Sequence, residues 1–502
     1  MAAPEAITPH NPATTARALY YVLAIAFAIR LAVALWFPNV IAFDEIYQYL
    51  EPAHRLVFGQ GFVPWEFQVG LRSWLIPLLL AGPMAVAHWL FADPLAGLVL
   101  IRGLLCLASL SIVWCAARWG ERFYGIPGLW IAGLLAAAWP DLWLMAPHSL
   151  EEVLAADVLV PALYLIETTT PGHSLHRVGL AGFLLGLACV FRMQLAPAIA
   201  LAGVVLCGRQ PIRWGVALAA AALPVFLAGM LDWYSWGQPF RSFWLNIYIN
   251  TNLGVTFGGF SPNPFDYYLH MLTLMWLWTL FLMAILIWRG AKLLPLSTAA
   301  ALIILLSHSL IAHKEYRYIF PAITLLVPIA GVGLAGWLAG LRRSQTALPP
   351  RLVLMALLLA GPFCSPWLYY MLTAQVASFS IFEKIKQQSS GLVALNQPDY
   401  YFLPLDMLFI HNTLVMPLTL DGMARLQPGA IVSPADGFMP PDHYHLDYCE
   451  HQEANPFTLD RKADICVWLN DRLISQPPPA PLVNFYVPDA AKPFIIRDRL
   501  TN

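Results

Sequence analysis

Charge is scarce in this 502-residue chain: Asp, Glu, Lys and Arg together make up 11% of it, and the formal net charge is −1. This near-neutral balance gives no bulk attraction to nucleic acid. The seven cysteines form no cluster with the spacing of metal ligands, so we expect no metal site built on them. Apolar residues are abundant instead, at 59% of the chain with a mean hydropathy of +0.63. This composition predicts a polytopic α-helical membrane protein.

Eleven apolar segments have the composition of membrane spans, although some are short. Together they define a transmembrane domain over residues 1–371. The predicted spans lie near residues 18–38, 97–117, 126–146, 149–166, 178–194, 195–208, 214–231, 267–288, 293–311, 317–340 and 351–371.

A further apolar run, 74–92, decides the topology. If this run lies in the membrane interface and the N-terminus is inside, every basic loop cluster faces inside, as the positive-inside rule requires. If the run crosses, the same clusters face outside. We therefore predict eleven spans and an amphipathic first outer loop over residues 39–96. The basic residues concerned are Arg118, Arg122, Arg177, Arg209, Arg213, Arg289, Lys292, Arg342, Arg343 and Arg351.

The C-terminal part of the chain differs in composition from the spans. Hydropathy falls after the last span, which predicts a small soluble domain over residues 372–502. Gly391–Leu395 and Ala430–Val432 are strand-like, so we expect a mixed α/β fold. An odd number of spans places this domain outside. Cys449 and Cys466 could pair there if the compartment is oxidising.

The first outer loop is unusually rich in charge. Asp44 and Glu45 stand together at the mouth of the first span, where carboxylates are costly unless they are used. If the segment after them is helical, Gln48, Glu51 and Arg55 share a face with Asp44. A solvated loop with a Glu51–Arg55 pair is the alternative, but it does not explain the density of charge.

Basic residues also occur where the predicted topology places the outer face. Arg192 stands between two apolar runs and needs an anion or a carbonyl; an Arg that snorkels from a span end is an equal alternative. The stretch His313–Arg317 precedes a span at its outer, N-terminal end. Lys314 and Arg317, with the free N–H groups of a helix start, predict a phosphate site. A belt of basic anchors is the alternative, but such anchors should lie inside.

Polar and aromatic residues share the segment from Asp232 to Asn252. Their hydrogen bonds and flat apolar faces suit sugars, although an interfacial aromatic belt explains the composition equally well. Glu151 and Glu152 begin another apolar run, and we interpret them as ordinary partners of a helix dipole.

Outward carboxylates and cations in a membrane indicate group transfer from a lipid phosphate. A carboxylate would take a proton from an acceptor hydroxyl, and cations would stabilise the departing phosphate.

Short motifs that carry these residues resemble one known family. The chain resembles the polyprenyl- or dolichyl-phosphate-mannose mannosyltransferases of glycosyltransferase family 22, in the GT-C superfamily, which act in N-glycan and GPI-anchor assembly. Each motif is weak alone, but their order is specific and they cover most of residues 20–340. In chain order they are Asp44–His54, Gly59–Phe62, Trp65-Glu66, Leu71–Ser73, Phe191-Arg192, Asp232 and His313–Tyr318.

The resemblance implies a GT-C fold, in which a transmembrane bundle carries catalytic outer loops. It implies inverting transfer of mannose from polyprenyl-phosphate-mannose to a lipid-linked or membrane-associated glycan acceptor, with no nucleotide-sugar, metal or other cofactor. An acidic residue of the first outer loop is the base in such enzymes; that role carries over to Asp44, with Glu45 as second candidate. The expected donor-phosphate contacts are Arg192, His313, Lys314 and Arg317. The expected substrate contacts are Glu51, His54, Trp65, Glu66, Arg72, Asp232, Asn246 and Glu315.

Two departures from the family pattern limit what the resemblance implies. The family's His-Pro-Asp-Glu opening is Ala42–Glu45 here, and its Pro-Trp-His-Trp-Tyr element is Asn263–Tyr268. The second change concerns the acceptor side, so we carry over no particular acceptor from the family.

The lack of an Asn-X-Ser/Thr sequon favours a bacterial inner membrane with a periplasmic site over the endoplasmic reticulum lumen. A flippase or transporter of lipid-linked sugars is an alternative function. A GT-C transferase of another hexose or a pentose is a second one.

Overall fold

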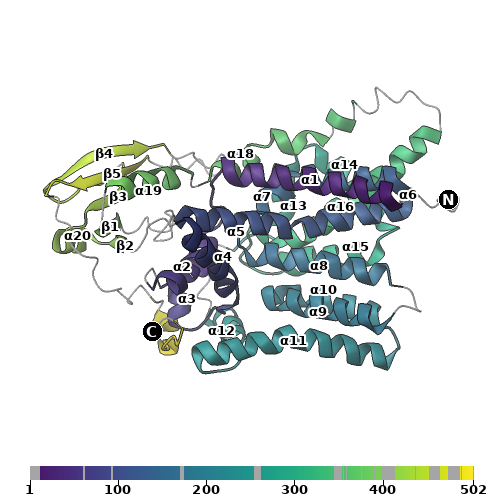
Figure 1. Cartoon of the computed structure of the whole chain (residues 1–502), viewed down its shortest axis with the longest axis horizontal. Helices are drawn as coiled ribbons and strands as arrows, with labels where there is room; N and C mark the ends of the chain where they lie inside the picture. The colour runs from purple at the N-terminus through teal and green to yellow at the C-terminus, as the bar shows by residue number, and fades with distance from the viewer. Residues whose placement is uncertain are drawn as a thin grey trace.

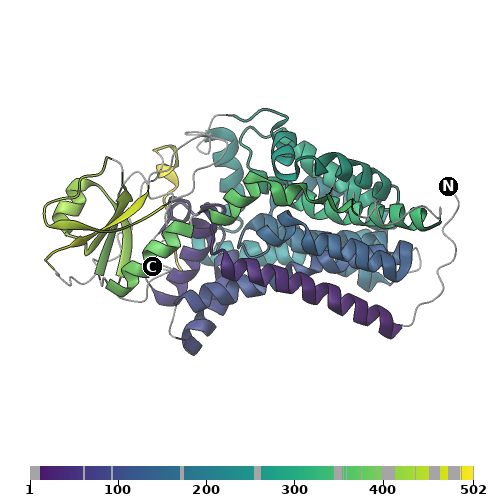
Figure 2. The same cartoon turned by 90° about the horizontal axis from the view of Figure 1, so that it is seen from above.

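The protein is a helical bundle with a β-sheet domain at one end, as Figure 1 and the perpendicular view in Figure 2 show in this computed structural model. The N-terminus lies at the opposite end of the bundle from the sheet. The structure describes residues 12–59, 63–91, 94–169, 174–253, 262–343, 353, 355–357, 359–374, 376–388, 391–396, 413–435, 437–451, 464–472, 487 and 489–500.

The first part of the bundle is formed by α1 (Pro12–Trp36), α5 (Pro94–Ala108) and α6 (Leu110–Ala138). Helix α6 is broken at Tyr124 and Gly125, where the backbone leaves helical geometry; Gly125 has φ 63° and ψ −154°. Glycine tolerates this conformation because it has no Cβ. The break makes α6 two arms, in agreement with the separate spans predicted near 97–117 and 126–146.

The two arms of α6 touch where both carry glycine. A Cβ added to Gly120 would lie 2.1 Å from the carbonyl oxygen of Gly128, and one added to Gly128 would lie 2.2 Å from that of Gly120. Small residues let helix backbones approach this closely inside a membrane, where packing replaces the hydrophobic effect as the force between helices.

The rest of the bundle follows in chain order. Helix α16 is its core, with 94% of its apolar stretch buried, whereas α11 is only 17% buried and faces the surroundings. Helices α13 and α14 meet at a bend of 108°, where Leu277 has φ 49°. The helices are α8 (Glu151–Glu167), α9 (Leu175–Phe191), α10 (Ala196–Cys207), α11 (Pro211–Trp236), α13 (Tyr267–Trp276), α14 (Thr279–Ala291), α15 (Pro295–Ser309) and α16 (Phe320–Arg343).

Several predicted spans are shorter than a bilayer requires. By length and composition, four described helical stretches are long and apolar enough to cross, and the bent α13–α14 pair makes a fifth. Helices α9, α10 and α15 have only 17, 12 and 15 residues, against about 20 for a full crossing. Helix α9 ends just before Arg192, and α15 ends just before the segment that contains His313. They are short because polar segments replace their outer turns; the predicted span 351–371 is only partly described.

The first outer loop forms η1 (Glu45–Leu50), α2 (Glu51–Phe58), α3 (Trp65–Gln68) and α4 (Leu75–Phe91). Figure 1 shows α4 grouped with α2 and α3 at the end of the bundle near the sheet domain, apart from the long parallel helices. This position agrees with the prediction that the run 74–92 does not cross. The predicted outer-loop helices are therefore present.

The C-terminal domain is a five-stranded mixed sheet of order β2-β1-β3-β5-β4. Strand β1 is parallel to β2 and β3, and β5 is antiparallel to β3 and β4. Cys449 and Cys466 face each other across the β4–β5 pair and form a disulfide. The mixed α/β prediction is confirmed. Helix α18 (Pro366–Thr373) precedes the domain and contacts α13 of the bundle. The elements of the domain are α19 (Val376–Gln388), β1 (Gly391–Asn396), β2 (Thr413–Leu418), α20 (Leu420–Leu426), β3 (Ala430–Pro434), β4 (Tyr444–Glu450) and β5 (Ile465–Asn470).

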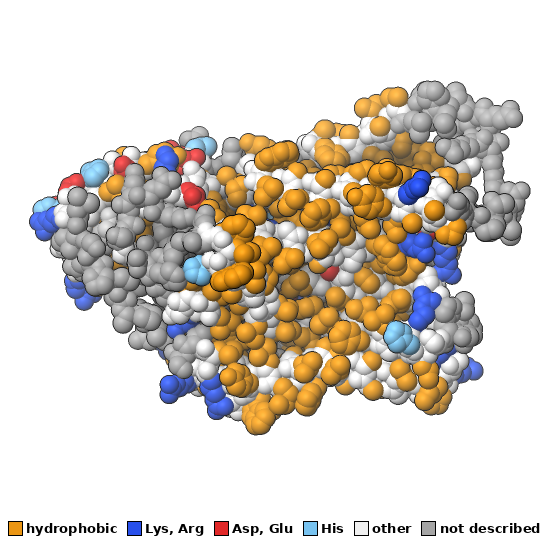
Figure 3. Space-filling model, viewed as in Figure 1, with side chains coloured by type: hydrophobic (Ala, Val, Ile, Leu, Met, Phe, Trp, Pro, Cys, Tyr) orange, Lys and Arg blue, Asp and Glu red, His pale blue; other side chains and the backbone are white. Residues whose placement is uncertain are grey.

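Basic side chains gather at the end of the bundle far from the sheet. Figure 3 shows Lys and Arg there, separated from the charged sheet end by an apolar surface. Two of these arginines hold helix ends together: Arg122 of α6 donates to the carbonyl of Glu167 at the end of α8 at 2.7 Å, and Arg177 of α9 donates to Thr168 at 3.3 Å. This separation of charge supports the predicted orientation, in which the basic end lies inside.

The two ends of α11 give a matched test of this orientation. We replace the free cysteines, keep the disulfide, and introduce Gln210→Cys or Gln238→Cys, since these glutamines flank the helix and are exposed. In intact cells an impermeant thiol reagent should label the second variant and spare the first.

Labelling of Gln210→Cys with protection of Gln238→Cys would invert the topology. Reaction of both variants after the membrane is permeabilised is the control for accessibility.

Candidate active site

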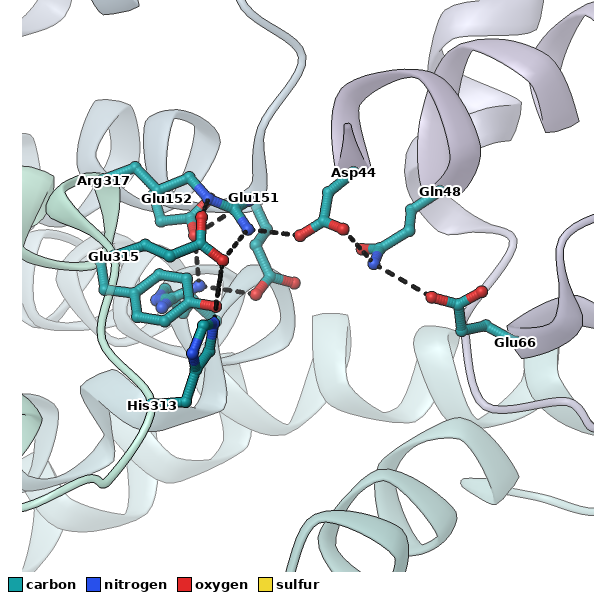
Figure 4. Close-up of polar contacts among 10 residues, drawn as sticks. Asp44, Gln48, Glu66, Glu151, Glu152, His313, Glu315 and Arg317 are labelled. Carbon is teal, nitrogen blue, oxygen red and sulfur yellow. Dashed lines mark hydrogen bonds and ion pairs between the residues drawn. The ribbon is translucent and has the colours of Figure 1, made fainter. Parts of the chain in front are cut away.

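A cluster of charged side chains lies at the end of the bundle nearest the sheet domain, and Figure 4 shows it. Its members come from segments far apart in the sequence: the turn before η1, the start of α8, the residue after α9 and the segment before α16. Low-dielectric surroundings make isolated charges costly, so charges gathered here must pair with one another.

Arg317 is the centre of this cluster. It lies in η5 (Tyr316–Ile319) and its side chain is only 6% exposed. Its Nε donates to Glu315 Oε2 at 2.7 Å, and its Nη2 donates to Asp44 Oδ2. Nη1 lies 3.6 Å from Glu152 Oε1. The guanidinium therefore joins three carboxylates from three segments.

Arg192 forms a second buried set of ion pairs. Its Nη1 donates to Glu151 Oε1 at 2.6 Å and to Glu152 Oε1 at 2.8 Å. Its guanidinium also lies 4.8 Å from the ring centre of Tyr318. The snorkelling alternative is wrong for this residue, because Arg192 is 3% exposed and paired with carboxylates. The reading of Glu151 and Glu152 as helix-dipole partners alone is also wrong, since they join the cluster to Arg192.

Asp44 is a carboxylate of the first outer loop that Arg317 holds, and its side chain is 34% exposed. Its Oδ1 accepts a hydrogen bond from Gln48 Nε2 at 2.8 Å, and the same amide reaches Glu66 Oε1 at 3.4 Å. Figure 4 shows this row running from Arg317 through Asp44 to Glu66. Burial raises the pKa of Glu66, although the charge of Arg72 opposes the shift. Gln48 was not among the predicted site residues, although it shares the predicted face with Asp44.

Glu45 points into the protein interior, unlike its neighbour. It is 1% exposed; its Oε2 lies 2.7 Å from Nδ1 of His148, and its Oε1 accepts from the backbone N–H of Ser149 at 3.2 Å. Glu51 and His54 are buried in α2, and the His54 ring packs on Phe58 at 4.4 Å. The structure does not bring these residues to the charged cluster.

The segment before α16 is held in place by several polar contacts. Lys314 Nζ donates to the backbone carbonyl of Asn263 at 2.9 Å. The backbone N–H of Lys314 donates to Asn263 Oδ1 at 3.0 Å. His313 Nε2 lies 3.1 Å from Glu315 Oε1. Although burial opposes ionisation, the Arg317 guanidinium and His313 hold the pKa of Glu315 well below its ordinary value. Arg317 is thus bound to an ionised partner.

Asp141 also holds the segment before α16 in place, through the neighbour of Arg317, Tyr316. Its Oδ2 accepts from the indole N–H groups of Trp139 and Trp276, each at 2.8 Å, and its Oδ1 accepts from the Tyr316 hydroxyl. The carboxylate is 1% exposed and therefore depends on these donors. It fixes the residue next to Arg317. No sequence pattern pointed to this role.

A cavity of about 360 Å³ adjoins the charged cluster, because Glu151 belongs to both. Its polar lining holds Arg72, Asp232 and Asn246, all predicted substrate contacts. Asp232 Oδ2 accepts from the backbone N–H of Ser242 at 2.8 Å and from its hydroxyl at 2.6 Å. The apolar lining comes from α9 and α11, from the first outer loop and from the segment around α12 (Arg241–Tyr248). Its residues include Cys189, Val190, Phe191, Val225, Ala228, Leu71, Leu75, Ile76, Phe240, Phe243 and Trp244.

Some of the predicted site residues belong to the charged cluster, others line the cavity, and a few lie in neither. Trp65 does not line the cavity and packs on an apolar group with Val69 and Leu245. No group of three or more His, Cys, Asp or Glu side chains is placed to hold a metal ion among the residues that the structure describes. The charged cluster contains Asp44, Glu66, Arg192, His313, Glu315 and Arg317, and the cavity contains Arg72, Asp232 and Asn246.

Glu45 and Asp44 should respond differently to loss of charge. Glu45→Gln weakens a fully buried pair with His148, which typically costs about 3 kcal/mol of stability. Asp44→Asn changes a side chain that is 34% exposed, so its effect on stability should be much smaller. Thermal unfolding of the two purified variants in detergent measures the difference, and an equal midpoint for both would contradict these distinct placements.

The overall fold matches a solved GT-C enzyme. The crystal structure of ArnT from Cupriavidus metallidurans bound to undecaprenyl phosphate superposes with a TM-score of 0.56 at 13% identity, covering 89% of this chain and 97% of that one. The apo structure of the same protein gives 0.55 at 14% identity. At such low identity the similarity concerns the fold, and the predicted GT-C architecture is confirmed.

Curated relatives agree with the predicted family. The chain is 31% identical over 322 residues to GPI mannosyltransferase 3 of Yarrowia lipolytica, covering 61% of each protein. It is 26% identical over 315 residues to GPI alpha-1,2-mannosyltransferase 3 of Mus musculus, covering 58% of this chain and 54% of that one. The chain thus spans less than two thirds of these relatives' length. The model of the Alg9-like mannosyltransferase family matches residues 21–397, and the chain belongs to that family.

Proposed function

We propose that this protein transfers mannose from a polyprenyl-phosphate-mannose donor to a hydroxyl of a lipid-linked or membrane-associated glycan, with inversion at the anomeric carbon. One observation carries the proposal: a cavity lined by α9, α11 and the first outer loop adjoins a cluster of carboxylates that includes the partly exposed Asp44. A site that accepts a lipid phosphate and delivers its sugar to a hydroxyl needs this combination. The mannosyltransferase relatives and the lipid phosphate bound by ArnT support it.

The donor fits the cavity by its chemistry. The prenyl chain would lie against apolar residues of α9 and α11, and the phosphate would lie at the polar end near Arg72. The Nε of Arg72 is buried and makes no hydrogen bond within the described part of the chain. The Nε of Arg192 is also unbonded there, but its Nη1 is bound to Glu151 and Glu152. Arg317 is bound to carboxylates, and Lys314 is bound to a carbonyl. We therefore assign the first phosphate contact to Arg72, and assign Arg192 and Arg317 the task of holding carboxylates in position.

The transfer step then follows from the geometry. The acceptor oxygen attacks the anomeric carbon and gives its proton to the Asp44 carboxylate, while the bond from that carbon to the phosphate oxygen breaks. The phosphate leaves with the bonding electrons, and Arg72 stabilises its charge. Arg317 and Gln48 hold the two oxygens of Asp44, which fixes the direction of the base. We propose that guanidinium groups supply the positive charge and that no metal takes part.

We place the site on the non-cytosolic side of the membrane. The Cys449–Cys466 disulfide in the sheet domain supports an oxidising compartment at that end. The periplasmic face of a bacterial inner membrane and the endoplasmic reticulum lumen both satisfy this condition. The absent sequon supports the first location, and the eukaryotic relatives support the second.

Product analysis tests the function directly. Purified protein is incubated with synthetic polyprenyl-phosphate-mannose and a panel of glycolipid acceptors in the presence of EDTA. We expect mannose in a new α linkage, and a loss of rate of about 10² to 10⁴ in Asp44→Asn, because a general base typically contributes that factor.

Movement of the donor across vesicles without product would indicate a flippase instead. Transfer from another sugar donor in preference to mannose would identify a different GT-C transferase, and full activity of Asp44→Asn would refute the mechanism.

Arg72 gives a second test, aimed at the phosphate. Arg72→Ala should weaken donor binding by about 10- to 100-fold, since a hydrogen bond between charged groups is worth roughly 1.5–3 kcal/mol. Arg72→Lys should recover part of the loss, because it restores the charge without the bidentate geometry. Arg209→Ala at the opposite end of the bundle is the control. Unchanged donor affinity in Arg72→Ala would return the phosphate to the segment around Lys314 and Arg317.

A further inference from the structure

The C-terminal segment returns from the sheet domain to the first outer loop. It comprises Val487, η9 (Asp489–Phe494) and residues 495–500, and Figure 1 places the C-terminus beside α3 and α12 (Arg241–Tyr248). A chain end is usually poorly ordered unless something ties it down. The contacts of this segment show what it is tied to.

Apolar side chains seat the segment in two places. Val487 and Ala491 are buried against Val69 and Leu71 of the first outer loop and Leu245 of α12. Further along, Ile496 and Leu500 pack on a buried aromatic group that joins the first outer loop to α11. That group is Phe67, Trp74 and Trp236, each 1% exposed.

Backbone hydrogen bonds fix the same contacts. The Ile496 N–H donates to the carbonyl of Gln68 at 2.9 Å, which ties the segment to α3. The Arg499 N–H donates to the carbonyl of Ser235 at 3.0 Å, which ties it to the end of α11. The segment thus bridges two elements that flank the cavity.

Arg241 connects this segment to the loop that carries Arg72. Its Nη2 donates to the carbonyl of Val69 at 2.9 Å and to the carbonyl of Phe494 at 2.8 Å. Gly70, at φ +71°, leaves room for it: a Cβ there would lie 2.7 Å from Arg241 Nε. One guanidinium therefore holds the first outer loop and the C-terminal segment together.

The elements held in this way are those that present the cavity's polar lining. The Trp236 indole N–H donates to the carbonyl of Arg72 at 3.2 Å, and Ser242, next to Arg241, donates to Asp232. We propose that the C-terminal segment, residues 487 and 489–500, is part of the donor site's supporting wall, and that Arg241 is the positioning residue that aligns Arg72 through it. The inference rests on the proposed function, in that it concerns the same cavity.

The test compares two variants of the full chain. Arg241→Ala removes both carbonyl contacts, and Lys492→Ala alters an exposed side chain of the same segment that pairs with Asp489. Arg241→Ala should raise the donor KM about tenfold, because small displacements of binding groups are costly, while the acceptor KM stays unchanged. Arg241→Lys should restore part of the loss, and Lys492→Ala should match the wild type.

A truncation after residue 486 and a binding assay complete the design. The truncated protein should lose donor affinity and regain it when a synthetic peptide of residues 487–500 is added. Binding of undecaprenyl phosphate, measured by thermal shift, reports on the cavity even if mannose transfer itself fails, so the two proposals are tested separately. If the truncation does not fold, the full-length Arg241 variants decide.

An Arg241→Ala protein with wild-type donor KM and undecaprenyl phosphate affinity would overturn the inference. An equal rise in donor and acceptor KM would also overturn it, because that result indicates a disturbance of the whole site and not of the donor wall alone.

Discussion

The buried guanidinium of Arg317 is the interaction on which the site depends. It is 6% exposed and bound to Asp44 from the first outer loop, Glu152 from α8 and Glu315 from its own segment. A buried charge without partners would be strongly destabilising, so these segments must meet for the bundle to fold. The same pairing fixes the orientation of the Asp44 carboxylate and leaves its side chain 34% exposed. A general base needs both a fixed orientation and access to the acceptor hydroxyl.

The membrane helices adapt to this polar centre. Helix α9 ends just before Arg192, and α8 begins at Glu151, so neither crosses a full bilayer by itself. Irregular backbone at this depth is tolerated only where protein covers it or where it lines a cavity. Here the chain at Glu151 lines the cavity, and the outer-loop helices cover the site. The C-terminal segment packs on the first outer loop and on α12.

Sequence reasoning found the residues whose chemistry is out of place in an apolar chain. Asp44, Arg192 and Arg317 stood out for this reason, and the fall in hydropathy after the last predicted span indicated the sheet domain. It missed the partners Glu151 and Glu152, because acidic residues at a helix start are common and their pairing with Arg192 spans about 40 residues. It ranked Asp44 ahead of Glu45 as the base, but it did not predict that Glu45 points into the interior, because a shift of one position along the chain turns the side chain inward.

The central claim is that the cavity and the charged cluster form one site. The most direct measurement is a structure of the Asp44→Asn variant with polyprenyl-phosphate-mannose bound. The account predicts the phosphate within about 3 Å of the Arg72 guanidinium, the prenyl chain along α9 and α11, and the anomeric carbon facing position 44. A phosphate bound to Lys314 or Arg317 with the cavity unoccupied would contradict it.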